Sequence, residues 1–279
     1  MRVKAVLPLL AVFGLLVTVG CTQATFFSRT PEQSALSGRM TVGHPFRMPQ
    51  TGRAAAFHKW NIPLMPLAPL PPAVKPVKTG PGLLPYVARV PTSRKVVFLT
   101  FDDGLEKDPE FVTMMRELNI PFTMFLTDRF IKDDYGYFKP LQELGNPIEN
   151  HTLTHPDLIH ITDQEQQAEI CGQQVKLTQE YGATPGLFRP PYGNMNAATV
   201  QIVKSCGGLR AVILWREAMD VTGVQFPVGE HAFQPGDIIL AHFRTPSQIQ
   251  GESMTAMTAN LLREIAAQGF SVAALEDYV

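Results

Sequence analysis

From residue 95 onward, short continuous apolar runs alternate with longer stretches in which apolar residues recur at helical spacing. The apolar runs have the length and the β-branched or aromatic content of buried strands. Five runs are clear and two are shorter: residues 96–101, 122–126, 210–214, 238–242 and 270–274, with the shorter candidates near Ile148 and Phe188.

The stretches between these runs predict helices, and two of them have legible starts. Asp108 and Pro109 supply an N-cap and a first-turn proline, and Thr162 with Glu165 forms a capping box before residues 166–181. Two further amphipathic stretches cover residues 196–206 and 257–268. Alternating strands and helices predict a parallel sheet with crossover helices. We therefore expect an α/β fold for residues 95–279, a distorted (β/α) barrel with about seven strands.

The first 20 residues read as a signal peptide. Arg2 and Lys4 precede an uncharged stretch that is too short to span a bilayer. The order Thr18, Val19, Gly20, Cys21 resembles the lipobox of bacterial lipoproteins, which implies lipidation of Cys21 and an extracytoplasmic, membrane-anchored protein. A plain secretory signal, and hence a secreted protein, is the alternative.

Residues 21–94 differ in composition from the rest, with nine prolines from Pro63 to Pro91. Proline lacks a donor and fixes φ, so helices and central strands are not expected between Pro63 and Pro91. The segment is either an extended tether or an arm that wraps the domain through apolar residues such as Trp60 and Met65.

The net charge and the cysteines bear on the kinds of ligand that the protein binds and on its covalent links. The net charge is −1 and no basic patch is present, which argues against nucleic acid and anionic membrane surfaces as ligands. Nothing in the sequence indicates more than a monomer. An extracytoplasmic location would allow Cys171 and Cys206 to form a disulfide, whereas otherwise they would be two small buried residues.

Candidate catalytic residues stand at the ends of four of the predicted strands, where barrels of this kind carry their chemistry. Asp102 and Asp103 end the first strand; an Asp-Gly pair is often a turn, but two adjacent acids are favourable if a metal neutralises one. His151 and His155 are four residues apart, as on one helical turn, although Pro156 favours a loop instead. One aspartate and two histidines suit a catalytic zinc ion, or iron as a facial triad.

Two more strand ends carry charge. Arg189 could hold an aspartate ionised and oriented, or could be an ordinary loop arginine. His242 ends a strongly apolar strand, where it is either a buried core histidine or a proton donor suited to neutral pH.

Together, the motifs "TFDDG", "HTLTH", "RPPYG" and "LAH", in this order, resemble the polysaccharide deacetylases of the NodB-like type, carbohydrate esterase family four. The resemblance covers about residues 95–279. It implies that Asp103, His151 and His155 bind a divalent metal, with zinc the first expectation. It also implies that Asp102 is the general base for the attacking water and that Arg189 steadies this base.

The same resemblance assigns the rest of the site. The backbone N–H of Tyr192 would stabilise the oxyanion, His242 would protonate the leaving amine, and Leu240 would wall the acetyl pocket. The position of Trp215 also matches the family, and the resemblance implies that Trp215 contacts the substrate.

One motif departs from the family pattern. Members usually carry Asp-x-x-Asp-Trp before the acid histidine, whereas this chain has "LWREAMDVTG" at residues 214–223. Either Asp220 or Glu217, or neither, would therefore orient His242.

These features predict a metal-dependent hydrolase that removes N-acetyl groups from an amino-sugar polymer of the cell wall, peptidoglycan or a chitin-like glycan. Two alternatives are a wall-glycan-binding lipoprotein with a degenerate site and an esterase acting on acetylated xylan.

Overall fold

The computed structural model describes residues 50–279; the predictions for residues 1–20 and for Cys21 lie outside these described residues. Ten strands form one sheet in the order β1-β6-β5-β4-β3-β2-β9-β7-β8, and β10 pairs with β2. Every pairing between strands is parallel except that of β7 with β8. The strands are β1 (Tyr86–Val87), β2 (Val96–Asp103), β3 (Thr123–Leu126), β4 (Ile148–Asn150), β5 (Leu187–Phe188), β6 (Ala211–Ile213), β7 (Glu217–Asp220), β8 (Gly223–Gln225), β9 (Ile238–His242) and β10 (Ser271–Val272).

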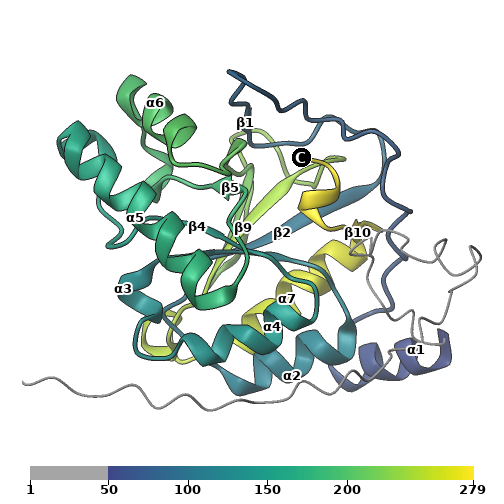
Figure 1. Ribbon diagram of the computed structural model, residues 1–279. Coiled ribbons are helices and arrows are strands. Elements are labelled where there is room, and N and C mark those ends of the chain that lie inside the picture. The colour runs from purple at the N-terminus through teal and green to yellow at the C-terminus, as the bar shows by residue number, and fades with distance from the viewer. Residues whose placement is uncertain (1–49) are drawn as a thin grey trace, which may run out of the picture. The chain divides into compact units, whose positions relative to one another are not determined.

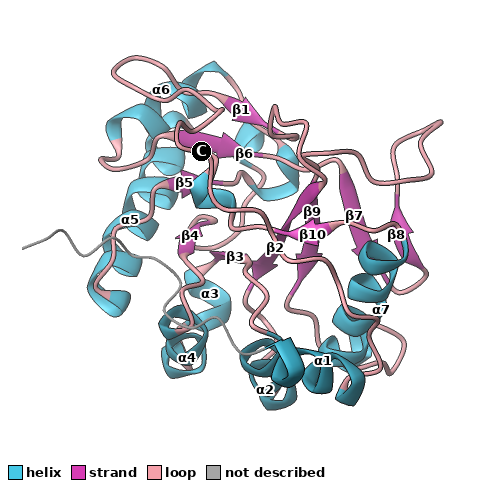
Figure 2. Cartoon of the chain, turned by 90° about the vertical axis from the view of Figure 1, so that its right-hand side faces the viewer, coloured by secondary structure: helices cyan, strands magenta, loops and turns pink. Residues whose placement is uncertain are grey.

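The sheet curls into an arc, and the helices cover its outer side (Figure 2). All seven predicted strands are present, as β2, β3, β4, β5, β6, β9 and β10, and the expected distorted (β/α) barrel is confirmed. The three strands that the pattern did not predict lie at the two edges of the sheet: β1 at one, β7 and β8 at the other.

The predicted helices are confirmed, and their caps explain where they begin. Asp108 accepts a hydrogen bond from Glu110 N, and the capping box between Thr162 and Glu165 is formed on both sides. No helix within residues 50–279 is long and apolar enough to cross a bilayer. The α-helices, all labelled in Figure 1, are α1 (Gln50–Lys59), α2 (Pro109–Leu118), α3 (Asp128–Ile131), α4 (Lys139–Glu143), α5 (Asp163–Tyr181), α6 (Ala197–Ser205) and α7 (Met254–Ala267).

The core between the sheet and the outer helices is rich in aromatic rings. Five phenylalanine side chains pack at centroid distances of 5.2–5.7 Å, mostly edge to face. Burial of each ring contributes about 1.5–3 kcal/mol, and two of the five stand next to the site residues at the ends of β2 and β9. The aromatic core therefore fixes these two strand ends. Its members are Phe101, Phe111, Phe122, Phe138 and Phe243.

The C-terminal residues close the inner side of the sheet near the points where the strands begin. The Tyr278 ring packs against Phe98 at 4.9 Å, and Lys75 Nζ donates to the Val279 carbonyl at 2.8 Å. The carboxyl ends of the strands lie at the opposite end of the barrel.

The described part of the proline-rich segment, residues 50–94, lies along the domain. Phe57, Ile62 and Met65 are buried in the same hydrophobic cluster as the outer core. Lys59 Nζ pairs with a carboxylate oxygen of Glu117 at 2.6 Å, and β1 extends the sheet beside β6. Of the two arrangements considered for this segment, residues 50–94 adopt the ordered arm.

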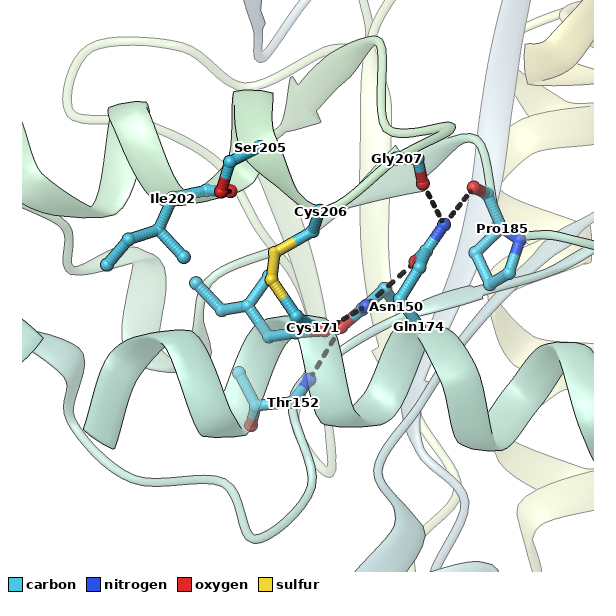
Figure 3. Close-up of a disulfide and its surroundings, with 10 residues drawn as sticks. Asn150, Thr152, Cys171, Gln174, Pro185, Ile202, Ser205, Cys206 and Gly207 are labelled. Atoms are coloured by element: carbon cyan, nitrogen blue, oxygen red, sulfur yellow. Dashed lines mark hydrogen bonds between the residues drawn. A yellow bond between two sulfur atoms is a disulfide. The ribbon is translucent and has the colours of Figure 1, made fainter. Parts of the chain in front are cut away.

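A disulfide links Cys171 on α5 to Cys206 at the end of α6 (Figure 3). Beside it, Gln174 Nε2 donates to the carbonyls of Pro185 and Gly207, at 2.6 and 3.0 Å. The two helices that follow β4 and β5 are thereby joined to each other and to the loop before β6.

Candidate active site

The end of β2 places two adjacent carboxylates in different surroundings. Asp102 is 2% exposed on the inner face of the sheet, whereas Asp103 leaves the strand with a left-handed backbone, φ 74°. Gly104 follows with φ 87°, and a Cβ there would lie 2.4 Å from Ile131 Cγ2. Only glycine fits this turn, and the turn sets the direction in which the Asp103 side chain leaves the strand.

The two histidines come from the loop after β4. Residues 151–155 are not helical, so the loop alternative suggested by Pro156 is the observed one. Thr152 and His155 both have positive φ, 68° and 62°. Asn150 supports the loop, because its Oδ1 accepts from Thr152 N at 3.0 Å.

Asp103, His151 and His155 converge, with one ligand atom of each lying within 4.8 Å of the others. Asp103 Oδ1 lies 3.3 Å from His155 Nε2 and 3.7 Å from His151 Nε2. His151 Nδ1 lies 2.7 Å from the Arg189 carbonyl oxygen. Because a carbonyl only accepts, Nδ1 carries the proton and the lone pair of Nε2 faces Asp103.

This trio fits a divalent metal. Asp103 Oδ1 is buried and makes no hydrogen bond with any described residue, which is costly unless a ligand satisfies it. One carboxylate oxygen and two imidazole nitrogens are donors that zinc accepts, and three protein ligands leave a position open.

Asp102 is held by a buried arginine. Arg189 is 0% exposed, and its Nη1 donates to Asp102 Oδ1 at 2.6 Å and to Thr100 Oγ1 at 2.8 Å. Its other donors reach the carbonyls of Ile213 and Leu214. The guanidinium is thus fixed on several sides, so the position of the Asp102 carboxylate is fixed as well.

Burial raises the pKa of Asp102 to about 6, and the positive charge and hydrogen bond of Arg189 oppose a larger rise. The carboxylate is therefore ionised at neutral pH yet basic enough to accept a proton. The second oxygen, Oδ2, is not bonded to Arg189 and lies 3.6 Å from His151 Nε2, on the side of the metal ligands.

His242 ends β9 and is the register partner of Asp102 across the parallel pair. Burial, followed by the charge of Arg244, lowers its pKa well below the usual value, and its Nδ1 has no hydrogen-bond partner among the described residues. Asp102 and His242 therefore stand side by side on two strand ends.

Neither of the two carboxylates expected as an orienting group for His242 bonds to it. Asp220 Oδ1 instead accepts from the backbone N and the hydroxyl of Thr222, both at 2.7 Å. Glu217 pairs in register with Ile239, whose side chain alternates with that of His242, and so lies on the other face of the sheet. Burial, reinforced by Asp237, raises the pKa of Glu217 to about 9.

Of the three residues expected to contact substrate, Tyr192 packs directly on the trio, and Trp215 and Leu240 lie beside other residues of the site. Tyr192, with φ 60°, is 63% exposed and its ring packs on His155 at 4.8 Å. Trp215 lies against Gly193 and 5.7 Å from the Arg189 guanidinium. Leu240 is buried on β9, two residues before His242.

Two contributors were not singled out from the sequence. Thr100 Oγ1 accepts from Arg189 and donates to the Ile239 carbonyl, joining β2 to β9 below the site. Arg244 stands just beyond β9, two residues after His242. The only sequence signal for Thr100 is its place two residues before Asp102 in an otherwise apolar strand.

Comparisons with known proteins relate this chain to one protein family. A family model described as polysaccharide deacetylase matches residues 89–211. An uncharacterised protein of Streptomyces coelicolor is 40% identical over 201 residues, 72% of this chain and 79% of that protein. A chitooligosaccharide deacetylase of Azorhizobium caulinodans is 30% identical, over 59% of this chain and 81% of its own.

A peptidoglycan-N-acetylglucosamine deacetylase of Bacillus cereus is 27% identical, over 65% of this chain and 86% of its own. Among solved structures, a peptidoglycan N-acetylglucosamine deacetylase superposes with a TM-score of 0.59 at 24% identity, covering 69% of this chain and 92% of that one. This likeness supports the fold described above.

Proposed function

Because the chain belongs to the polysaccharide deacetylase family, we propose that it is a metal-dependent hydrolase that removes N-acetyl groups from an amino-sugar polymer of the cell wall. The observation that carries the proposal is the convergence of Asp103, His151 and His155 beside an aspartate that Arg189 holds in place. Peptidoglycan is the first candidate substrate and a chitin-like polymer the second, in line with the relatives named above.

Asp103, His151 and His155 would hold the metal, for which zinc is our choice from the donor set. When bound, a divalent metal supplies positive charge that polarises the acetyl carbonyl and makes the attacking water more acidic. The His151 tautomer fixed by the Arg189 carbonyl keeps Nε2 available as a ligand.

Asp102 is assigned as the general base. Arg189 occupies Oδ1, so Oδ2 is the oxygen that accepts the proton of the attacking water. The carboxylate cannot rotate away without breaking the 2.6 Å bond, and the pKa of about 6 keeps it unprotonated at neutral pH. Arg189 is a positioning residue in this scheme.

The remaining residues complete amide hydrolysis. The backbone N–H of Tyr192 is assigned to the oxyanion, and Leu240 and Trp215 to the walls around the acetyl group and the sugar. His242 is assigned as the acid that protonates the leaving amine, a step that amide hydrolysis requires because an amine anion is a poor leaving group.

One observation favours a second candidate, a wall-glycan-binding protein that retains the metal site but hydrolyses poorly. His242 Nδ1 has no hydrogen-bond partner among the described residues, and its pKa is lowered, first by burial and then by nearby positive charge. An acid without a carboxylate behind it is less well oriented and less readily protonated.

We further propose that Cys21 anchors the protein by a lipid on the outer side of the membrane. The proposal rests on the order of residues 18–21 after an uncharged stretch. It would place the domain beside the wall glycan that it acts on.

Acetate release tests the function. The zinc-loaded chain and an Asp102→Asn variant would be compared on peptidoglycan, chitin oligomers and acetylated xylan. Release from an N-acetylated polymer by the wild type, with a loss of at least 10³-fold in the variant, is the expected result. Zinc binding without release from any polymer would favour the binding protein, and release from xylan alone would favour the esterase.

A further inference from the structure

Arg244 is a cation at the mouth of the site to which the mechanism above gives no role. The β2–β9 pairing continues past β9, because Phe243 N donates to the Asp102 carbonyl at 3.1 Å. The Phe243 side chain is 0% exposed in the aromatic core outside the sheet. Alternation along the strand therefore places Arg244 on the same face as His242, one step nearer to solvent.

The charge of this guanidinium acts on titratable groups at three strand ends. Burial dominates the pKa shifts of Asp103 and His242, and hydrogen bonds from Thr222 dominate that of Asp220. Burial raises the pKa of Asp103 overall, whereas the pKa values of Asp220 and His242 are lowered; in all three the charge of Arg244 is a smaller contribution that acts to lower the pKa. The charge of Arg244 thus acts on groups at the ends of β2, β7 and β9, which agrees with its place just beyond β9 on the His242 face.

The guanidinium has no hydrogen-bond or ion-pair partner among the residues that the structure describes. It is half-buried, yet it makes no hydrogen bond, ring contact or ion pair within 4.0 Å among residues 50–279. Lys107, by contrast, donates to three backbone carbonyls, those of Gly104, Leu105 and Phe130. The nearby Asp220 carboxylate is occupied by Thr222. A half-buried arginine whose donors are all free is suited to a ligand anion.

The chemistry of the leaving group indicates which anion fits. His242 is assigned to the amine at C2 of the sugar, and Arg244 is its neighbour on the same strand. O3 is on the ring carbon next to C2, so a substituent on O3 lies beside the acetamide that is hydrolysed and within reach of a residue neighbouring His242. An N-acetylmuramic acid residue carries a carboxylate on its O3 lactyl ether, whereas N-acetylglucosamine carries only a hydroxyl.

We propose that Arg244 is a specificity-determining residue that binds the carboxylate of an acidic N-acetyl sugar, as in N-acetylmuramic acid, while the adjacent acetamide occupies the site. This inference rests on the proposed deacetylase function. A hydrogen-bonded guanidinium–carboxylate pair should favour the acidic substrate by about 10- to 100-fold in kcat/KM.

The test uses two oligosaccharides that differ only in charge: one with an N-acetylmuramic acid residue at the reacting position, and its neutral carboxamide. The zinc-loaded full-length chain would be assayed for acetate release beside Arg244→Gln, Arg244→Lys and the control Arg116→Gln, which removes an exposed charge on α2. The measured quantity is the ratio of kcat/KM for acid over amide. An effect of Arg244 on His242 cancels in this ratio, because both substrates use the same acid.

We expect a ratio of at least 10 for the wild type and for Arg116→Gln, a ratio near 1 for Arg244→Gln, and an intermediate ratio for Arg244→Lys. Calorimetric binding of the two saccharides to an Asp102→Asn background should show the same order in Kd. A wild-type ratio near 1, or an unchanged ratio in Arg244→Gln, would overturn the inference.

A neutral chitin tetramer separates the two ways of failing. Acetate release from the tetramer together with a flat acid-to-amide ratio refutes the role of Arg244 alone. No release from tetramer, acid or amide refutes the proposed function and this inference with it.

Discussion

At the scale of single residues, the sequence shows which side chains form the site but not the directions in which they point. The motifs identify Asp102, Asp103 and Arg189 as candidates, and the structure brings them together. The sequence does not reveal that Asp103, His155 and Tyr192 have positive φ, because such strained backbone is stabilised by surrounding contacts. It also could not exclude Glu217 and Asp220 as partners of His242, since that depends on strand register.

Replacing Arg189 by lysine tests the role assigned to it. The substitution keeps a charge but loses the planar guanidinium, whose Nη1 bonds both Asp102 and Thr100 while its other nitrogens bond two backbone carbonyls. A lysine ammonium is held less firmly, so the Asp102 carboxylate is less stabilised and its pKa rises. A base must be ionised, so the acid limb of the pH profile of kcat/KM should move to higher pH, with a loss of about 10²-fold near pH 6.5.

The profile would be recorded below the melting temperature of the variant, because removing bonds to a buried charge also destabilises the fold by about 3 kcal/mol. Thr100→Val, which removes only one of the bonds to Arg189, is the matched milder change. An acid limb at the wild-type position in Arg189→Lys would contradict the role of Arg189.

At the scale of elements, the sequence was sufficient to predict a helix that carries its own caps and a strand that is a long apolar run. The helices α2 and α5 begin at their predicted caps, and β2 and β9 at or next to the predicted residues. The edge strands β7 and β8 were missed because their pairing is tertiary and their sequence, "EAMDVTGVQ", has little apolar character.

Glu217 on β7 provides a prediction about this edge. Its carboxyl is 0% exposed, and burial with the neighbouring Asp237 raises its pKa to about 9, far above the unfolded value of about 4.3. Between about pH 5 and pH 9, the Glu217 carboxyl therefore keeps its proton in the folded state and has lost it in the unfolded state. Stability should fall as pH rises through this window.

The variant Glu217→Gln removes this titration and should be more stable than the wild type at pH 8.5, by up to a few kcal/mol, and similar to it near pH 5. Arg89 and Arg216, which also act on this carboxyl, remain in both proteins. Urea unfolding at several pH values measures the difference, with the exposed Glu110→Gln as control. Parallel pH profiles for Glu217→Gln and the wild type would refute the buried, protonated state.

At the scale of the whole molecule, one end of the barrel carries the candidate site, and the C-terminal residues close the other. The alternation of runs predicted the parallel sheet, and so also the meeting of distant motifs at one end. It did not predict how the proline-rich segment lies, because proline excludes helices and central strands without saying what the chain packs against. The helix α1 and the contacts of residues 50–94 follow from tertiary packing.

The arm should contribute to the stability of the domain. Phe57→Ala removes a ring that is 1% exposed, and should lower the free energy of unfolding by about 3–5 kcal/mol. Leu70→Ala, at a side chain 78% exposed on the same arm, should change it by less than about 0.5 kcal/mol. Denaturant unfolding of both variants distinguishes a packed arm from a tether, for which the two substitutions would have equally small effects.

The central claim is that Asp103, His151 and His155 hold a metal on which deacetylation depends. The most direct measurement is acetate release from a wall glycan by protein that has been stripped with a chelator, dialysed and titrated with zinc. Activity should be absent after chelation and should return to a plateau at one zinc per chain, while His151→Ala should neither bind this zinc tightly nor regain activity. Full activity in protein shown by elemental analysis to hold less than about 0.05 metal ions per chain would contradict the account.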